Sequence, residues 1–240
     1  MTPGMQFPDP DASCALFNAH VRNVICRGDK AKADYFFDWL ALVVQRLNSK
    51  PNVALWLNGE KRAGKGLCCK YVSRLFEPRF VNSPSVTDLT RKFASHLASC
   101  KLLLVDEATF AISQEASAVM KTIISEKMIT VRRKYVAAFE MPLVTAVIAC
   151  TNMNIDRINK FHPGLRRRTA AFDVSNEKVG DTGYFTALAA EMMSGGPARL
   201  MYDCLSRDIT SFDEKKLPFS LIIKSMQYLQ NYLPTNNATE

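Results

Sequence analysis

A chain of 240 residues is long enough for one sizeable domain, or for a core with a small appendage. Its 48% hydrophobic and 22% charged residues are those of an ordinary globular protein and exclude disorder as the main state. An excess of 31 basic over 23 acidic residues gives a net charge of +8, which favours a polyanionic partner such as nucleic acid; a role in solubility is the alternative.

Cysteine usage and the apolar runs bear on the cellular compartment. The seven cysteines form no C-x-x-C pair and their count is odd, so we expect no disulfide framework and a reducing, cytoplasmic environment. The opening MTPGMQFPDPD has neither a basic start nor an apolar stretch, so we expect no secretory signal. No apolar run approaches about 18 residues, and we therefore expect no membrane partner.

Hydrophobic periodicity predicts the elements of the first part of the chain. Residues 1–17 contain three prolines and are predicted to be irregular, and an amphipathic helix is predicted over 32–48. The short apolar run NVALWL, 52–57, is rich in strand-forming residues and is followed at once by a glycine-rich loop. A helix over 65–76 completes the order of strand, loop and helix that a phosphate-binding loop requires.

The remainder of the chain continues the alternation of strands and helices. Ser85 is predicted to cap a helix, and ITVRRKYVAAFE, 129–140, is predicted to form a basic hairpin. The other predicted strands are 101–107, 143–150 and 170–174, and the other predicted helices are 113–126, 181–194, 197–206 and 217–231. This alternation predicts an α/β fold with a mostly parallel sheet covered by helices on both faces, followed by a helical last third.

The glycine-rich loop matches most of the pattern G-x-x-x-x-G-K-[ST]. Gly66 stands where a magnesium-binding hydroxyl is usual. Glycines let backbone N–H groups approach phosphate oxygens, and the following helix adds the positive end of its dipole. Lys65 would supply a charge for the outer phosphates. The residues predicted to bind the nucleotide are Gly59, Glu60, Lys61, Arg62, Ala63, Gly64, Lys65 and Gly66.

Polar residues also follow two of the predicted buried strands. Asp106 and Glu107 end the run KLLLVDE, where Asp106 is predicted to hold Mg²⁺ and Glu107 to orient and deprotonate the attacking water. A pair of acids without catalytic function is the alternative. Asn152 follows the strand VIAC at the sheet edge where ligands bind, and is predicted to sense the γ-phosphate unless it is a simple turn residue.

Two basic runs remain open to several interpretations at this point. The arginines of GLRRRTAAFD form a solvated face, a nucleic-acid patch or an arginine finger that stabilises transition-state charge on a neighbouring subunit's nucleotide. Arg132, Arg133 and Lys134 lie between two strand-like runs and suit contacts with a phosphate backbone, with an ordinary basic turn as the alternative.

The segments GEKRAGKG, KLLLVDE, ISEKMITVRRKY, VIACTN and LRRRTAAFDVS resemble, in this order, the motifs of superfamily 3 helicases, which are AAA+-like ATPases of viruses, phages and plasmids. The chain is most similar to the helicase portion of phage and plasmid primase-helicases, the branch related to the poxvirus-type replicative NTPase. The resemblance covers about residues 20–233. Gly66 departs from the usual Ser or Thr, and no primase domain is visible.

The resemblance implies the remaining roles. Lys65 would bind the β- and γ-phosphates of ATP, and Arg168 would be the arginine finger, with Arg167 as the next candidate. The run Arg132, Arg133 and Lys134 would contact the translocating strand. The implied partners are single-stranded or forked DNA, further copies of the chain in a hexameric ring, and a separate primase, all in the cytoplasm of a host cell.

The predicted organisation is a lead-in and helix over 1–50, an ATPase core over 51–176, a helical extension over 177–233 and a flexible tail over 234–240. An ATP-dependent, ring-forming DNA helicase of a phage, plasmid or related element is the leading functional hypothesis. A nucleotide-dependent DNA-binding ring or loader that does not unwind duplex is the alternative, and an inactive interaction protein with the same fold is a third class.

Overall fold

The computed structural model describes residues 6–83, 97, 99–105, 114–133, 136–152, 165 and 167–221, with the backbone alone at 114, 132, 133 and 136. Its helical segments are α1 (Ala15–Ala19), the π-helix η1 (His20–Ile25), α2 (Lys30–Gln45), α3 (Lys65–Ser73), α6 (Gln114–Ser125), α9 (Thr182–Met193) and α10 (Gly196–Ser206). Its strands are β1 (Ala54–Asn58), β2 (Phe80–Ser83), β3 (Leu102–Val105), β4 (Met128–Arg133), β5 (Val136–Pro142), β6 (Ala146–Thr151) and β7 (Thr169–Asp173).

Five strands form the central sheet, in the order β2-β3-β6-β1-β7. Every neighbouring pair is parallel, so all five strands end at the same edge of the sheet. The strand β1 lies between β6 and β7, and the chain leaves its carboxyl end to reach β2 at the far edge. In open parallel sheets, ligands bind beside the carboxyl ends of the strands where the order changes direction, so the loop after β1 occupies the expected position of a ligand site.

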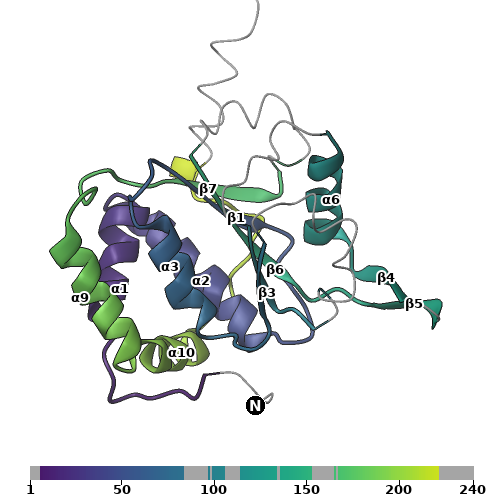
Figure 1. Cartoon of the computed structure of the whole chain (residues 1–240), viewed down its shortest axis with the longest axis horizontal. Coiled ribbons are helices and arrows are strands. Elements are labelled where there is room, and N and C mark those ends of the chain that lie inside the picture. The colour runs from purple at the N-terminus through teal and green to yellow at the C-terminus, as the bar shows by residue number, and fades with distance from the viewer. Residues whose placement is uncertain are drawn as a thin grey trace, which may run out of the picture.

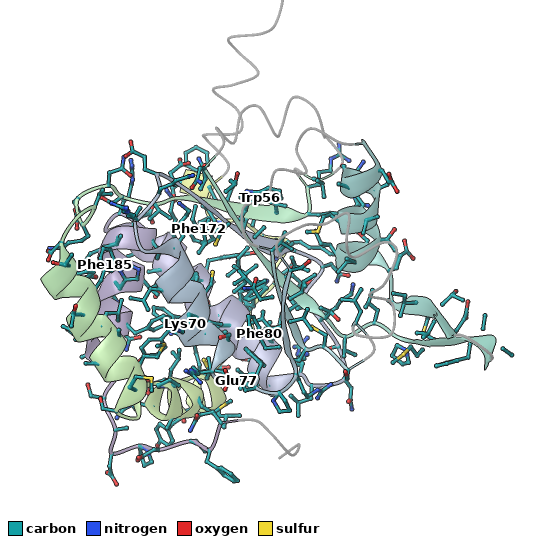
Figure 2. The ribbon with its side chains drawn as sticks, in the orientation of Figure 1. Trp56, Lys70, Glu77, Phe80, Phe172 and Phe185 are labelled. Carbon is teal, nitrogen blue, oxygen red and sulfur yellow. The ribbon has the colours of Figure 1, made fainter. Side chains whose placement is uncertain are left out.

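Helices cover both faces of this sheet, as expected for parallel strands (Figure 1). One core combines side chains of β1, β3, β6 and β7 with those of α1, η1, α2, α3, α9 and α10. The second core places the alternate strand residues against α6. Figure 2 shows the division on two adjacent strands, where Phe172 points into the first core and Trp56 into the second. The predicted fold class, α/β with a mostly parallel sheet between helices, is confirmed.

The hairpin β4–β5 stands apart from the main sheet and extends away from the body of the protein (Figure 1). Its strands are antiparallel, with Arg133 opposite Val136, which confirms the hairpin predicted over 129–140. Val131 is buried, whereas the residues 137–140 of β5 are exposed. The hairpin therefore has one strand with a buried side chain and one strand that faces solvent.

The structure differs from the sequence-based expectation at the N-terminus. The prediction of an irregular segment over 1–17 is wrong from residue 15, because α1 and η1 follow one another without a break. Phe17, Val21 and Ile25 are fully buried in the first core, so tertiary packing orders this segment. The strand β2 was also not predicted; it lies at the sheet edge and three of its four residues are at least partly exposed.

Several other expectations can be compared with the structure. The seven cysteines are free and buried, so no disulfide joins them. The predicted helix over 32–48 is α2. Most of its side chains from Tyr35 to Val44 are buried, on most sides of the helix, because α10 and η1 pack against it in addition to the sheet. The helix expected after Ser85 lies almost entirely outside the described residues, as does most of the helix expected over 217–231. Within the described residues, no helix combines the length and apolar character needed to cross a bilayer.

Candidate functional site

The loop between β1 and α3 borders a large cavity at the carboxyl edge of the sheet. The cavity has a volume of about 970 Å³, which lies in the range of small-molecule and cofactor sites. Loop and α3 residues from Lys61 to Leu67 form one wall, and residues 150–152 at the end of β6 form the floor. The predicted loop residues 61–66 therefore all line the cavity, beside the N-terminal end of α3, where anions are stabilised by the helix dipole.

Lys65 is the most constrained side chain of this loop. It is only 7% exposed, and its Nζ donates hydrogen bonds to the carbonyl oxygens of Gly59 and Glu60, each at 2.6 Å. A third bond, of 3.0 Å, joins Nζ to Oδ1 of Asn152. The structure therefore brings together two of the predicted site residues, Lys65 and Asn152, from the segments that follow the adjacent strands β1 and β6. A phosphate that enters this position would compete with these oxygens for the ammonium group.

Gly64 has a backbone conformation and surroundings that only glycine fits. Its φ of +95° lies in the left-handed region, and it precedes the first residue of α3. A Cβ on Gly64 would lie 2.5 Å from Cε1 of His20 and 2.9 Å from Cε1 of Phe185. Gly66 is the opposite case, since a Cβ there would meet nothing within 4 Å. Position 66 therefore has room for the hydroxyl side chain that the phosphate-loop pattern expects, although glycine stands there.

His20 supports the loop from inside the core. Its ring is fully buried; Nε2 lies 3.3 Å from the Gly64 carbonyl oxygen, and Nδ1 lies 2.9 Å from the Tyr184 hydroxyl. Burial lowers the pKa of His20 from 6.5 to about 4. In the neutral ring, Nε2 carries the proton and donates to the carbonyl, because a carbonyl oxygen only accepts, and Nδ1 accepts from Tyr184. His20 thus joins the glycine-rich loop to α9.

The helix α9 forms the remaining wall of the cavity, which the sequence analysis did not predict. The lining residues from this helix are Thr182, Phe185, Thr186 and Ala189, with Gly180 just before it. Asp181 caps the helix by accepting from the Tyr184 backbone N–H at 2.9 Å. Phe185, labelled in Figure 2, also packs edge-on against His20, with 6.2 Å between ring centroids. The helical extension is therefore part of the candidate site.

The ends of β1 and β7 add a polar pair at the same sheet edge. Nδ2 of Asn58, the last residue of β1, donates to Oδ1 of Asp173, the last residue of β7, at 3.1 Å. The sequence analysis did not single out either residue. Both residues end a strand, and Asn58 directly precedes the glycine loop. This position at a strand end is the sequence signal by which they could have been predicted as site residues.

The acidic half of the predicted site lies outside the described residues. Both Asp106 and Glu107 fall there, directly after β3, so their placement relative to Lys65 stays a prediction. In the part of the chain that the structure describes, no group of three or more His, Cys, Asp or Glu side chains is arranged to hold a metal ion. The loop residues suit the phosphates of a nucleotide, and Asp106 stays the predicted protein ligand for Mg²⁺.

Arg168 lies at the opposite end of the sheet from the cavity. Its carbonyl accepts from the backbone N–H of Ala54, at the beginning of β1, whereas the glycine-rich loop follows the end of that strand. Five strand residues at about 3.3 Å each separate the two positions by roughly 16 Å. The Nε of Arg168 donates to the Ser125 hydroxyl at the end of α6, and Arg167 is exposed. Neither arginine lines the cavity of its own chain.

Two of the three predicted DNA-binding residues lie in the hairpin. Arg132 and Arg133 belong to the end of β4, where the structure describes their backbone, and Lys134 lies outside the described residues. The hairpin and the cavity are thus formed by different segments of the chain (Figure 1).

Comparison with known proteins identifies the fold. A family model described as "Family of unknown function (DUF5906)" matches residues 57–168, a range that contains every predicted site residue. No curated protein matches the sequence. Among solved structures, one of the apo C-terminal region of NrS-1 aligns with a TM-score of 0.74 at 16% identity, covering 98% of this chain and 55% of that one.

A second structure of the NrS-1 C-terminal region, an A form, gives a TM-score of 0.71 at 18% identity, with 96% of this chain and 54% of that one covered. The chain has the fold of that region. It spans about half the length of the structures it matches.

The two glycines of the loop form a matched pair for mutation. We expect Gly64→Ala to lower the free energy of unfolding by about 2–3 kcal/mol, because the new Cβ is strained by φ and clashes with the buried His20 ring. Gly66→Ala, in open space at the start of α3, should change it by less than about 1 kcal/mol. Urea-induced unfolding of both variants measures the difference, and equal stabilities would contradict this account of Gly64.

The low pKa of His20 predicts a specific loss of stability in acid. The unfolded chain takes up a proton near pH 6.5 but the folded chain only near pH 4, so stability present above pH 6.5 is lost as the pH falls. Between pH 7 and pH 5 we expect wild type to lose about 2 kcal/mol more than His20→Gln in urea unfolding. An NMR titration of the His20 ring is the direct check, and a pKa of 6 or higher would contradict burial of the neutral form.

Proposed function

We propose that the chain is an ATP-dependent, ring-forming DNA helicase or translocase that acts in the replication of a phage, plasmid or related mobile element. The observation that carries this proposal is the position of Lys65, at the N-terminal end of α3 and beside the cavity, in hydrogen-bond contact with Asn152. The ordered motifs that resemble superfamily 3 helicases support it. A parallel α/β fold with the site at the strand ends is consistent with that assignment.

In the proposed reaction, Lys65 exchanges its loop carbonyls for the β- and γ-phosphates of ATP. Asn152, already within 3.0 Å of Lys65, is then placed to contact the γ-phosphate. Asp106 would hold Mg²⁺, which neutralises charge on the phosphates when it is bound. Glu107 would orient and deprotonate the attacking water. The apolar residues of α9, above all Phe185, offer a surface for the base of the nucleotide.

The position of Arg168 supports action between subunits. Arg168 lies about 16 Å from the phosphate loop of its own chain. It is therefore suited to contact the nucleotide of another chain. A head-to-tail ring places one subunit's surface against a different surface of the next, and a hexamer is the proposed closure. The basic hairpin residues Arg132, Arg133 and Lys134 would contact single-stranded or forked DNA through its phosphates, and a separate primase is a further proposed partner.

Gly66 favours a second candidate, a DNA-binding ring or loader that hydrolyses ATP without unwinding duplex. The missing hydroxyl leaves Mg²⁺ to phosphate oxygens, water and Asp106, which would weaken the binding of the metal. A forked-duplex assay distinguishes the two functions. ATP turnover without strand displacement, at protein concentrations that form rings, supports the loader. Failure to bind a labelled ATP analogue would instead support an interaction protein without nucleotide.

Hydrolysis should depend on the buried lysine and on the proposed base. We expect Lys65→Ala and Glu107→Gln each to lower DNA-stimulated ATP hydrolysis by about 100-fold or more, because charge stabilisation or water activation is lost. Lys70→Ala is the matched control, since Lys70 is an exposed lysine on the same helix (Figure 2) and should retain the wild-type rate. A robust rate in either of the first two variants would exclude the assigned role.

Mixing of inactive subunits tests the role of Arg168 between chains. Arg168→Ala retains its own Lys65, and Lys65→Ala retains its own arginine, so a mixed ring contains interfaces in which both groups are intact. At a one-to-one ratio we expect ATP hydrolysis to recover to on the order of a quarter of the wild-type rate. No recovery in mixtures that form rings, checked by native mass spectrometry, would contradict action in trans.

A further inference from the structure

The C-terminal end of α6 is held by two cations, which lie at the edge of the sheet opposite the cavity. Arg168, directly before β7, donates from Nε to the hydroxyl of Ser125, the last residue of α6. Lys50, shortly before β1, donates from Nζ to the carbonyl oxygen of Ile123 in the last turn of the same helix. The last carbonyl groups of a helix lack partners within the helix and carry the negative end of its dipole, so both cations stabilise this end.

The same end of α6 is joined directly to the base of the hairpin. Only Glu126 and Lys127 separate Ser125 from the first residue of β4. The backbone N–H of Leu143, just after β5, donates to the Lys127 carbonyl at 2.8 Å. Leu143 is buried in the second core, and Ile129 packs against the same core. A shift of the end of α6 would therefore be transmitted to both strands of the hairpin at their base.

We propose that Ser125 is a positioning residue, which holds Arg168 within its own subunit while the nucleotide site of the neighbouring subunit is empty. When Arg168 turns to the neighbour's nucleotide, the contact with Ser125 is lost and the base of the hairpin is released. This inference rests on the proposed function, because it takes Arg168 as the residue that acts between subunits. A phosphate oxygen is a stronger acceptor for a guanidinium than a hydroxyl, so ATP in the neighbouring site would draw Arg168 from Ser125. The hairpin of each subunit would then report the nucleotide state of the next.

The variant Ser125→Ala removes the contact, and two further serine variants serve as controls. Ser117→Ala removes another hydroxyl from α6, one that is buried and has no hydrogen-bond partner in the part of the chain that the structure describes. Ser125→Thr retains the hydroxyl at the same position and should behave as wild type. Neither Ser125 nor Ser117 lines the cavity, so nucleotide binding itself should be retained in all three variants.

The first measurement is amide hydrogen exchange in the hairpin of the nucleotide-free protein. We expect exchange in β4 and β5 to be about five-fold faster in Ser125→Ala than in wild type, Ser117→Ala or Ser125→Thr. The second measurement is the ratio of ATP hydrolysis with single-stranded DNA to hydrolysis without it. This ratio should fall about five-fold or more in Ser125→Ala, while hydrolysis without DNA is retained.

The two measurements separate failure of this inference from failure of the proposed function. Unchanged hairpin exchange in Ser125→Ala would overturn the positioning role, whether or not the protein hydrolyses ATP. Faster exchange with an unchanged DNA-stimulation ratio would overturn the link to the neighbouring site. Absence of ATP hydrolysis in the wild-type protein would overturn the proposed function, and the link between nucleotide and hairpin with it.

Discussion

A buried ammonium group requires hydrogen-bond acceptors, and the position of Lys65 is determined by where it finds them. Two carbonyl oxygens come from the loop after β1 and one amide oxygen comes from Asn152 after β6. These acceptors converge because β1 and β6 are adjacent and parallel. Three features keep this amine at the edge of the cavity: the parallel order of the sheet, the packing of α3 and the support of Gly64 by His20.

Most of the sheet could be predicted because its strands are short, uninterrupted apolar runs. β1, β3 and β6 are buried almost throughout, which is the pattern of parallel strands covered on both faces. β2 lacks this pattern because it is a partly exposed edge strand. The helical segment from α1 to η1 could not be predicted from local signals either, since it depends on contacts with distant residues, such as the stacking of Phe17 on Tyr71 at 4.2 Å between ring centroids.

The candidate site was predictable to the extent that its residues follow strands. The glycine loop and Asn152 carry recognisable patterns, and parallel strands bring such residues to one edge. The wall formed by α9 carries no such pattern, because threonine, phenylalanine and alanine are common in any helix and Phe185 is distant from the loop in sequence. The Arg168–Ser125 contact likewise depends on the pairing of β7 with β1, which periodicity does not specify.

The burial of all seven cysteines makes the chain convenient for spectroscopic work. Burial raises the pKa of thiols such as Cys26 and Cys100 to about 12, and alkylating reagents need both a thiolate and access to it. A cysteine introduced at an exposed position of β5, such as Glu140, would therefore be the readily labelled thiol in an otherwise native chain. A fluorophore at that position would follow the hairpin during turnover without prior removal of any native cysteine.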